Sequence, residues 1–591
     1  MSAKRSQRPP VEVPGFRQPT DGATGGFGWR LPFAWIAVSA VVLRGLAWFS
    51  YDPVTFDSAV YFEMAALFRG GRWAEALAYD YPPLYPLLIA GLQGMVGRAD
   101  AAGVLVAAVA DLAILVPIFA IARLAVDEAA AWGAAFLWVA HLSAIRLGVQ
   151  ALSDAPTALF VVIAIYAGLR ALRARRFVWA WGAGMAGGLA FLCRPEGLEP
   201  VVGLALFYAL YADPSAQSPA HTGRAPLGAR RSTLETPYPA HAPAASSRAH
   251  QVIHRMGWVL APLMGWALVA GPYVAYISVE AGSFTLSKKK SAASIVRSSV
   301  RLPLAESQAP SDRSPEPSGE SRESGAGGRD LRAANGDARA ERTVAPSPGQ
   351  GAARRLWARV DAFQKPLVNG LTPLLLVTGA VGTAGILRRR GERWNRTLAL
   401  LSGLFIVHFS ILVGLAAHAG PAYLGRHHFL LMAVYALPTA GAGLAWSWVW
   451  MTGKFQGQRW VPSVALGLVV VATAIAVVIR GPEQGRSLRE AAVWIRSQVA
   501  GTPVIVTRLA KLTYHAGAER VDLAGTYDEI LRRARGRSAH FVALYPDLVR
   551  LTSPNFLEHL PSPDLELAQV FPEPSRNAPD QRLEIYRIRR R

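Results

Sequence analysis

The chain has 591 residues, of which 52% are hydrophobic and 17% are charged, and its mean hydropathy is +0.23. This composition excludes an ordinary soluble protein of this size, because so much apolar surface needs lipid around it. The net charge of +22 does not indicate a nucleic-acid partner, because the Lys and Arg residues lie mainly in short runs between apolar segments and in one polar insertion.

Long apolar runs recur through most of the first 480 residues. Because about 20 largely apolar residues cross the hydrocarbon core as a helix, we expect a mainly α, polytopic membrane protein of about eleven transmembrane helices. Residues 1–30 form a polar tail, expected to be cytoplasmic, and the apolar run after it lacks a small-residue cleavage site, so it should be retained. The expected spans are 31–50, 101–123, 129–148, 154–172, 177–193, 196–212, 256–279, 366–387, 397–419, 427–450 and 461–480.

The run 83–97 is short for a span and begins with a pair of prolines, so we expect a helix in an outer-surface loop that does not cross the membrane. With the N-terminus inside, this choice places every strongly basic short loop on the cytoplasmic side. Those loops contain Arg170, Arg173, Arg175 and Arg176, the segment 213–255, Arg388, Arg389, Arg390, Arg393 and Arg396, and finally Lys454 and Arg459.

The same alternation of inside and outside loops places four regions outside: 51–100, 149–153, 280–365 and everything after residue 480. Residues 303–352 are rich in Ser, Pro, Gly, Glu and Arg, which predicts a disordered insertion. Residues 482–591 return to a soluble composition, with a helical pattern at Leu488–Val499 and strand patterns at Pro503–Thr507, His540–Tyr545 and Arg582–Ile588. We therefore expect a transmembrane domain over 31–480 and a small periplasmic α/β domain over 482–591.

The first outside loop is acidic, and its most prominent carboxylate is Asp57 in Phe56-Asp57-Ser58-Ala59-Val60-Tyr61. A carboxylate just above the bilayer is well placed to deprotonate an acceptor hydroxyl. The alternative is a solvated acidic loop that follows the positive-inside bias.

Two further motifs fall on the same predicted face. Asp154 opens a helix, where it or Ser153 is also a good N-cap, and Arg194 and Glu196 lie between two spans at the outer boundary. Charged residues at that depth are costly unless they are paired or hydrated. We therefore expect the carboxylates of Asp57 and Asp154 to converge on one site, with capping and an interfacial ion pair as the alternatives.

Candidate phosphate ligands come later in the chain. Arg426, followed by His427 and His428, precedes a late span, and a guanidinium makes paired, charge-assisted bonds to phosphate oxygens. Lys288, Lys289 and Lys290 follow the span that ends near residue 279 and either add positive charge at a lipid phosphate or contact lipid headgroups. No nucleotide, zinc or nucleophile-elbow motif is present in the sequence, and no cofactor is predicted beyond a divalent metal as an option.

Taken in order, these motifs resemble the GT-C superfamily of integral membrane glycosyltransferases, specifically the bacterial relatives of protein O-mannosyltransferases and of the lipid A aminoarabinose transferase. The resemblance covers about residues 31–480, and the soluble tail resembles the C-terminal domain common in bacterial members. The matching stretches are Phe56 to Tyr61, Tyr81-Pro82-Pro83-Leu84-Tyr85-Pro86, Ser153 to Pro156, Arg194 to Gly197 and Arg426 to His428.

The resemblance implies a polyprenyl-phosphate-sugar donor in the membrane lipid and a protein, lipid or glycan acceptor at the periplasmic face of a bacterial inner membrane. It implies catalytic roles for Asp57 and Asp154. It implies donor-phosphate or substrate binding by Arg426, Arg194, Lys288, Glu196, His427, Tyr61, Tyr81 and Tyr85.

The chain departs from the family pattern at two positions. Many relatives carry a second acid directly after the first-loop aspartate, where this chain has Ser58, and Lys or His before the proline pair, where it has Tyr81. A secondary transporter and a non-catalytic scaffold are the competing functions. A transporter predicts two repeated halves, and the sequence has no internal repeat.

Overall fold

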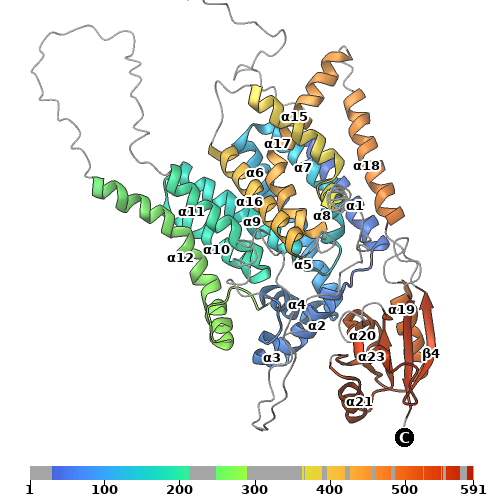
Figure 1. Cartoon of the computed structure of the whole chain (residues 1–591). Helices are drawn as coiled ribbons and strands as arrows, with labels where there is room; N and C mark the ends of the chain where they lie inside the picture. Colours follow the sequence, from blue (N-terminus) through green and yellow to red (C-terminus); the bar gives the residue numbers. More distant parts are fainter. Residues whose placement is uncertain are drawn as a thin grey trace, which may run out of the picture.

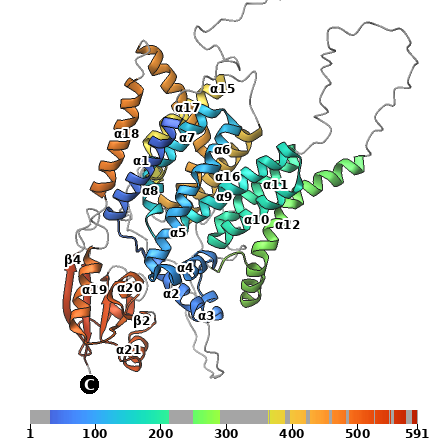
Figure 2. The same cartoon turned by 180° about the vertical axis from the view of Figure 1, so that it is seen from behind.

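The structure is a computed structural model that describes residues 30–211, 248–288, 363–364, 366–388, 396–419, 426–455, 460–480, 486–523, 525–546, 549, 554–572 and 582–589. A helical bundle forms the larger part, and a small α/β unit lies beside one end of it (Figures 1 and 2). The predicted insertion 303–352 lies outside the described residues, as does the tail before Arg30.

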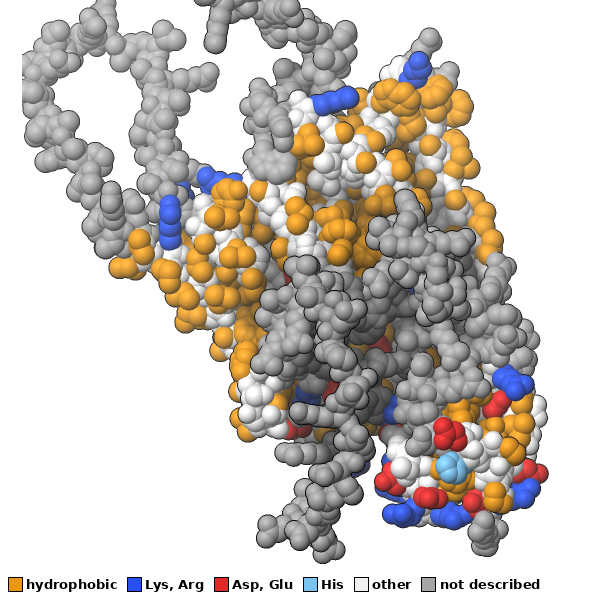
Figure 3. Space-filling model, viewed as in Figure 1, with side chains coloured by type: hydrophobic (Ala, Val, Ile, Leu, Met, Phe, Trp, Pro, Cys, Tyr) orange, Lys and Arg blue, Asp and Glu red, His pale blue; other side chains and the backbone are white. Residues whose placement is uncertain are grey.

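The bundle confirms a polytopic helical membrane protein. Hydrophobic side chains cover much of its surface, whereas charged side chains gather on the α/β unit (Figure 3). The bundle helices are α1 (Arg30–Ser50), α5 (Ala99–Ala113), α6 (Leu115–Ala125), α7 (Glu128–Val139), α8 (Leu142–Gly148), α9 (Asp154–Ala174), α10 (Phe177–Cys193), α11 (Glu199–Tyr211), α12 (Arg248–Ala281), α15 (Pro373–Arg388), α16 (Arg396–Ala419), α17 (Leu430–Lys454) and α18 (Trp460–Arg480).

Fewer helices are long enough to span the membrane than the roughly eleven that the sequence predicts. Among the described residues, 6 helices are long and apolar enough to cross a membrane, or up to 7 if a bent pair counts as one span. The expected spans 31–50, 177–193 and 366–387 correspond to shorter apolar helices, and 196–212 is a short 3-10 helix followed by α11. Pro195 explains the last case, because its ring cannot continue α10. α12 begins at Arg248, so the last part of the expected loop 213–255 is helical.

The expected single span 129–148 is two helices, α7 and α8, bent by 60°. His141 caps α8, because its side chain accepts a hydrogen bond from the Ala144 amide. The Val139 carbonyl at the end of α7 accepts a bond of 2.6 Å from Arg44, whose Nε also contacts Asp111 at 2.8 Å. The break is therefore stabilised by partners from α1 and α5, and it needs no proline.

Close packing between bundle helices depends on glycine. A Cβ atom on Gly133 of α7 would lie 2.5 Å from the Gly441 carbonyl oxygen of α17. Small residues at such crossings let two backbones approach and gain van der Waals contact in lipid. This contact joins the broken span to a late helix.

We predict that Gly133→Ala destabilises the protein by about 1–3 kcal/mol, because the added methyl group must push α7 and α17 apart. Thermal unfolding in detergent measures the effect. Gly403→Ala on α16 is the control, since a Cβ atom there meets no atom within 4 Å. Equal unfolding temperatures for the two variants would contradict the packing argument.

The segment between α1 and α5 folds into three helices at one end of the bundle: α2 (Phe56–Arg69), α3 (Trp73–Leu77) and α4 (Leu84–Val96). The expected helix 83–97 is therefore present as α4, whose 13 residues are fewer than a span needs. It ends at Gly97, which adopts the left-handed conformation that glycine tolerates.

The C-terminal unit confirms the expected α/β fold, as a five-stranded mixed sheet in the order β2-β1-β3-β5-β4. β1 pairs in parallel with β2 and β3, and β5 pairs antiparallel with β3 and β4. The strands are β1 (Val504–Val506), β2 (Glu519–Val521), β3 (Phe541–Leu544), β4 (Leu565–Pro572) and β5 (Arg582–Ile588), and the helices are α19 (Arg486–Gln498), α20 (Ala510–Ala516), α21 (Tyr527–Gly536) and α23 (Pro554–Glu558). The sequence patterns predict α19, β1, β3 and β5, and they miss the three-residue β2 and the edge strand β4.

A charged contact joins this unit to the segment between α1 and α2. The Asp52 carboxylate lies 2.8 Å from Lys511 Nζ, with His515 Nε2 at 3.6 Å and Arg489 Nη1 at 3.8 Å. Burial alone would raise the pKa of Asp52, but the contacts with His515 and Lys511 outweigh it and hold the pKa well below its ordinary value. Asp52 is therefore ionised at neutral pH.

We predict that this contact survives from pH 8 down to about pH 5, because a carboxylate whose folded pKa is lowered stabilises the fold above the ordinary aspartate pKa of about 4. The stabilisation is lost only as the pH falls through the lowered folded pKa. Hydrogen exchange of α20 amides as a function of pH measures it, with Asp52→Asn as the variant that lacks the charge. Loss of protection in the wild type between pH 7 and pH 5 would contradict the assignment.

Candidate active site

The candidate site begins at the first turn of α2, where a capping box fixes the helix start. The Thr55 hydroxyl accepts a hydrogen bond from the Ser58 amide at 3.2 Å, and the Ser58 hydroxyl accepts one from the Thr55 amide at 2.9 Å. This reciprocal pair satisfies two amides that the helix leaves open and places Asp57 in the first turn. Ser58 is fully buried, so the departure from the family's second acid has a structural role.

A cluster of three tyrosines lies beside Asp57. The Tyr81 hydroxyl donates to Asp57 Oδ1 at 2.8 Å, and the Tyr61 ring packs edge-on against both Tyr81 and Tyr85. Burial, and next the Asp57 charge, raise the pKa of Tyr81, so this phenol stays protonated and remains a donor. Asp57 itself is partly exposed.

The same cluster reaches α9 and the loop after α10. The Tyr61 hydroxyl lies 3.1 Å from Ser153 Oγ, next to Asp154. Arg194 Nη1 donates to Asp154 Oδ1 at 2.9 Å, and its Nε lies 3.5 Å from Glu196 Oε2. Asp154 is 5% exposed and lies in the first turn of α9, where the helix N-terminus favours an acidic side chain.

Arg194 dominates the electrostatics of this cluster. Burial alone would raise the pKa of Glu196, but the Arg194 charge and a backbone hydrogen bond lower it to about 2. One guanidinium therefore serves two carboxylates, in a turn formed by the 3-10 helix η1 (Pro195–Leu198).

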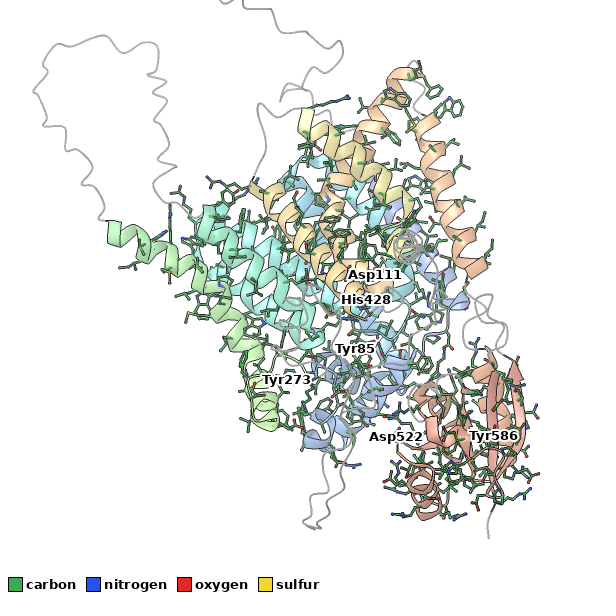
Figure 4. All side chains as sticks on the ribbon, in the orientation of Figure 1. Tyr85, Asp111, Tyr273, His428, Asp522 and Tyr586 are labelled. Atoms are coloured by element: carbon green, nitrogen blue, oxygen red, sulfur yellow. The ribbon has the colours of Figure 1, made fainter. Side chains whose placement is uncertain are left out.

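Seven of the predicted site residues therefore form one cluster, linked by side-chain contacts and through Ser153. They come from α2, the turn before α4, α4 itself, α9, and the turn from α10 into η1. Tyr85, labelled in Figure 4, lies where the first-loop helices meet the end of the bundle. Its hydroxyl donates to the Gly103 carbonyl at 3.0 Å. The seven are Asp57, Tyr61, Tyr81, Tyr85, Asp154, Arg194 and Glu196.

Lys288 lies in the segment that follows α12 and contacts the first loop. Its Nζ donates to the Leu77 carbonyl at 2.6 Å and to Glu280 Oε2 at 2.5 Å, and it lies over the Tyr276 ring. These partners tie α12 to α3, and none of them belongs to the Asp57 cluster.

The backbone of Arg426 and His427 lies in the 3-10 helix η5 (Arg426–Phe429), and their side chains lie outside the described residues. The His428 carbonyl of this helix is 2.7 Å from His408 Nε2, and His408 Nδ1 contacts both carboxylate oxygens of Glu199 at 2.8 and 2.9 Å. His408 and Glu199 thereby join η5 to the start of α11, which directly follows η1.

Several charged residues near this end of the bundle are missed by the sequence patterns. His408, Glu199, Asp52 and Glu63 all make side-chain contacts between elements that are far apart in the chain, which no local motif indicates. Arg44 and Asp111 are different, because a charge inside an apolar run is itself a signal of a buried partner. Within the described ranges, no group of three or more His, Cys, Asp or Glu side chains is arranged to hold a metal ion.

Comparisons with known proteins agree with this architecture. Residues 80–223 match the family model described as dolichyl-phosphate-mannose-protein mannosyltransferase. Comparison with curated protein sequences gave no match.

Two solved structures of one protein have a similar fold, and a third structure aligns with a lower score. ArnT from Cupriavidus metallidurans bound to undecaprenyl phosphate aligns with a TM-score of 0.51 and 13% identity over 94% of this chain and 97% of that chain. Its apo state gives the same score and identity over 94% of this chain and 98% of that chain. The Archaeoglobus fulgidus oligosaccharyltransferase in its apo form aligns with a TM-score of 0.49 and 12% identity over 90% of this chain and 72% of that chain.

Residues 80–223 thus match a membrane mannosyltransferase family model, and the chain has a fold similar to that of ArnT over 94% of its length. Both findings agree with the resemblance to multi-pass membrane glycosyltransferases that the motifs predict.

We predict that Arg194→Met destabilises the protein by on the order of 3 kcal/mol, because it leaves the buried Asp154 carboxylate without its partner. The double variant with Asp154→Asn removes the more buried of the two carboxylates that Arg194 serves and should recover part of the loss. Thermal unfolding of both variants in detergent measures this coupling. A double variant that is no more stable than Arg194→Met would show that the pair does not act as a unit.

Proposed function

We propose that the chain transfers a sugar from a polyprenyl-phosphate-linked donor to an acceptor hydroxyl or phosphate on a protein, lipid or polysaccharide. The observation that carries this proposal is the joining of Asp57 to the Asp154–Arg194 pair by buried tyrosines at one end of a membrane bundle. A base and a cation are thereby placed near each other, as acid–base transfer to a phosphate leaving group requires.

In this mechanism Asp57 is the general base. The Tyr81 phenol occupies one carboxylate oxygen and orients the group, and the other oxygen remains to accept the proton of an acceptor hydroxyl. The hydroxyl oxygen forms a bond to the anomeric carbon as the bond between that carbon and the phosphate oxygen breaks. The product sugar is inverted at that carbon, and polyprenyl phosphate leaves.

The leaving phosphate needs positive charge. We assign this role to Arg194, the cation within the cluster, and to Arg426, whose helix η5 is joined through His408 to Glu199 at the start of α11. Asp154 holds Arg194 in position, and Glu196 and His427 complete this end of the site. Lys288 then stabilises the first loop through Leu77 and Glu280, and its assignment to the phosphate is kept as an alternative.

Several features support this donor and location. The matched family model is named for a dolichyl-phosphate-mannose donor, and the ArnT structure of similar fold binds undecaprenyl phosphate. The positive-inside count places the Asp57 end of the bundle outside the cell membrane, so we assign a bacterial inner membrane with the site at the periplasmic face. A transporter would place its charges near the middle of the bilayer, whereas these lie at helix ends.

We predict that Asp57→Asn lowers the rate of sugar transfer by about 10²–10⁴-fold, because the amide cannot accept the proton. The measurement uses the purified protein with tritium-labelled polyprenyl-phosphate mannose, glucose and aminoarabinose, and follows both transfer to membrane acceptors and donor hydrolysis. Glu75→Gln is the matched control, since this exposed acid of the same loop pairs only locally with Arg72 in the described contacts. Turnover in Asp57→Asn equal to that of Glu75→Gln would reject the assigned base.

A further inference from the structure

The C-terminal unit contacts α2 through a second charged pair besides the Asp52 cluster. Arg520 Nη2 donates to Glu63 Oε2 at 2.9 Å, and the Tyr79 hydroxyl donates to the same oxygen at 3.2 Å. The Phe62 ring packs against Tyr514 with centroids 4.9 Å apart. The contact is therefore mixed, with an apolar centre and ion pairs around it.

The charges on the two sides of this contact are complementary. Asp52, between α1 and α2, and Glu63, on α2, supply the acids. The C-terminal unit supplies Lys511 and Arg520. Lys511 is 7% exposed and Asp52 is 6% exposed, so this pair is shielded from salt. The acidic bias of the first loop is thus partly explained by its partner in the same chain.

The α2 helix presents different faces to the C-terminal unit and to the candidate site. Asp57 and Tyr61 are four residues apart and share one face, which contacts Tyr81 and Ser153. Phe62 and Glu63 point to another face, which contacts α20 and β2. A shift of the C-terminal unit therefore moves the backbone that carries Asp57.

The Asp52 segment links the same contact to the start of α9. The Gln150 side chain donates to the Asp52 carbonyl at 3.2 Å, and the Ala151 amide donates to the Pro53 carbonyl at 2.9 Å. Both residues lie just before Asp154. The C-terminal unit is thus connected to each of the two carboxylates of the site.

We propose that the C-terminal unit holds α2 in its catalytic position, and that Glu63, Arg520, Asp52 and Lys511 are positioning residues for Asp57. This inference rests on the proposed function of Asp57 as the base. A misplacement of about 1 Å at a reacting group costs up to about a hundredfold in rate, so a contact remote from the chemistry controls turnover.

The experiment exchanges the charges of the Glu63–Arg520 pair in the full-length protein. Glu63→Arg and Arg520→Glu each place like charges together, and the double variant restores an opposite pair. We expect each single variant to lower kcat about tenfold with KM little changed, because the substrate still binds while the base is displaced. We expect the double variant to recover most of the loss.

Hydrogen exchange of the α2 amides supplies a readout that does not depend on activity. Exchange should be faster in both single variants and return toward the wild-type rate in the double variant. Arg589→Glu is the matched control, because it reverses an arginine in an exposed pair with Glu566 of β4, at the opposite edge of the sheet from β2. It should leave exchange of α2 and turnover unchanged.

Two outcomes would overturn the inference: single variants with wild-type turnover and α2 exchange, or a double variant as impaired as the singles. A wild-type protein that neither transfers nor hydrolyses any of the three labelled donors would instead reject the proposed function. An active wild type with unaffected charge variants would reject only the positioning role.

Discussion

The ion pair between Arg194 and Asp154 is the contact on which the arrangement of the candidate site depends. It joins the end of α10 to the start of α9, and both groups are largely shielded from water. An unpaired charge at this depth is energetically costly, so each group keeps the other in place. The contact between Ser153 and Tyr61 connects this ion pair to α2, where Tyr81 donates a hydrogen bond to Asp57.

Local sequence patterns predict those parts of the fold that local chemistry determines. The apolar runs at 154–172, 397–419 and 461–480 correspond closely to α9, α16 and α18, because lipid imposes both length and composition on such helices. The prediction of a single span at 129–148 is wrong. Hydropathy measures how apolar a segment is, and it is insensitive to the cap at His141 and to the bond from Arg44 to Val139. The strand β4 is missed for a related reason. It lies at the edge of the sheet and pairs only with β5, so its sequence pattern is weak.

The sequence predicts the motifs of the candidate site, but it predicts fewer of the contacts between their side chains. The shared face of Asp57, Asp154 and Arg194 follows from counting spans and charges, and the structure joins them through side chains. The partners of Asp52 and Glu63 lie more than 400 residues away, in a domain whose sequence carries no matching motif. The acidic loop thus combines one acid assigned to chemistry, two that bind the C-terminal unit and one, Glu75, that pairs with its neighbour Arg72.

The bond from Arg44 to Val139 bears on how the chain is assembled. α1 precedes α5 and α7 in the chain, so Arg44 is synthesised before either of its partners, Asp111 and Val139. Until those later segments arrive, the cation must stay near water or lipid headgroups, because an unpaired charge in hydrocarbon is costly. The first helix therefore reaches its final depth only after α5 and α7 have joined it, which makes membrane insertion of the N-terminal half a cooperative event.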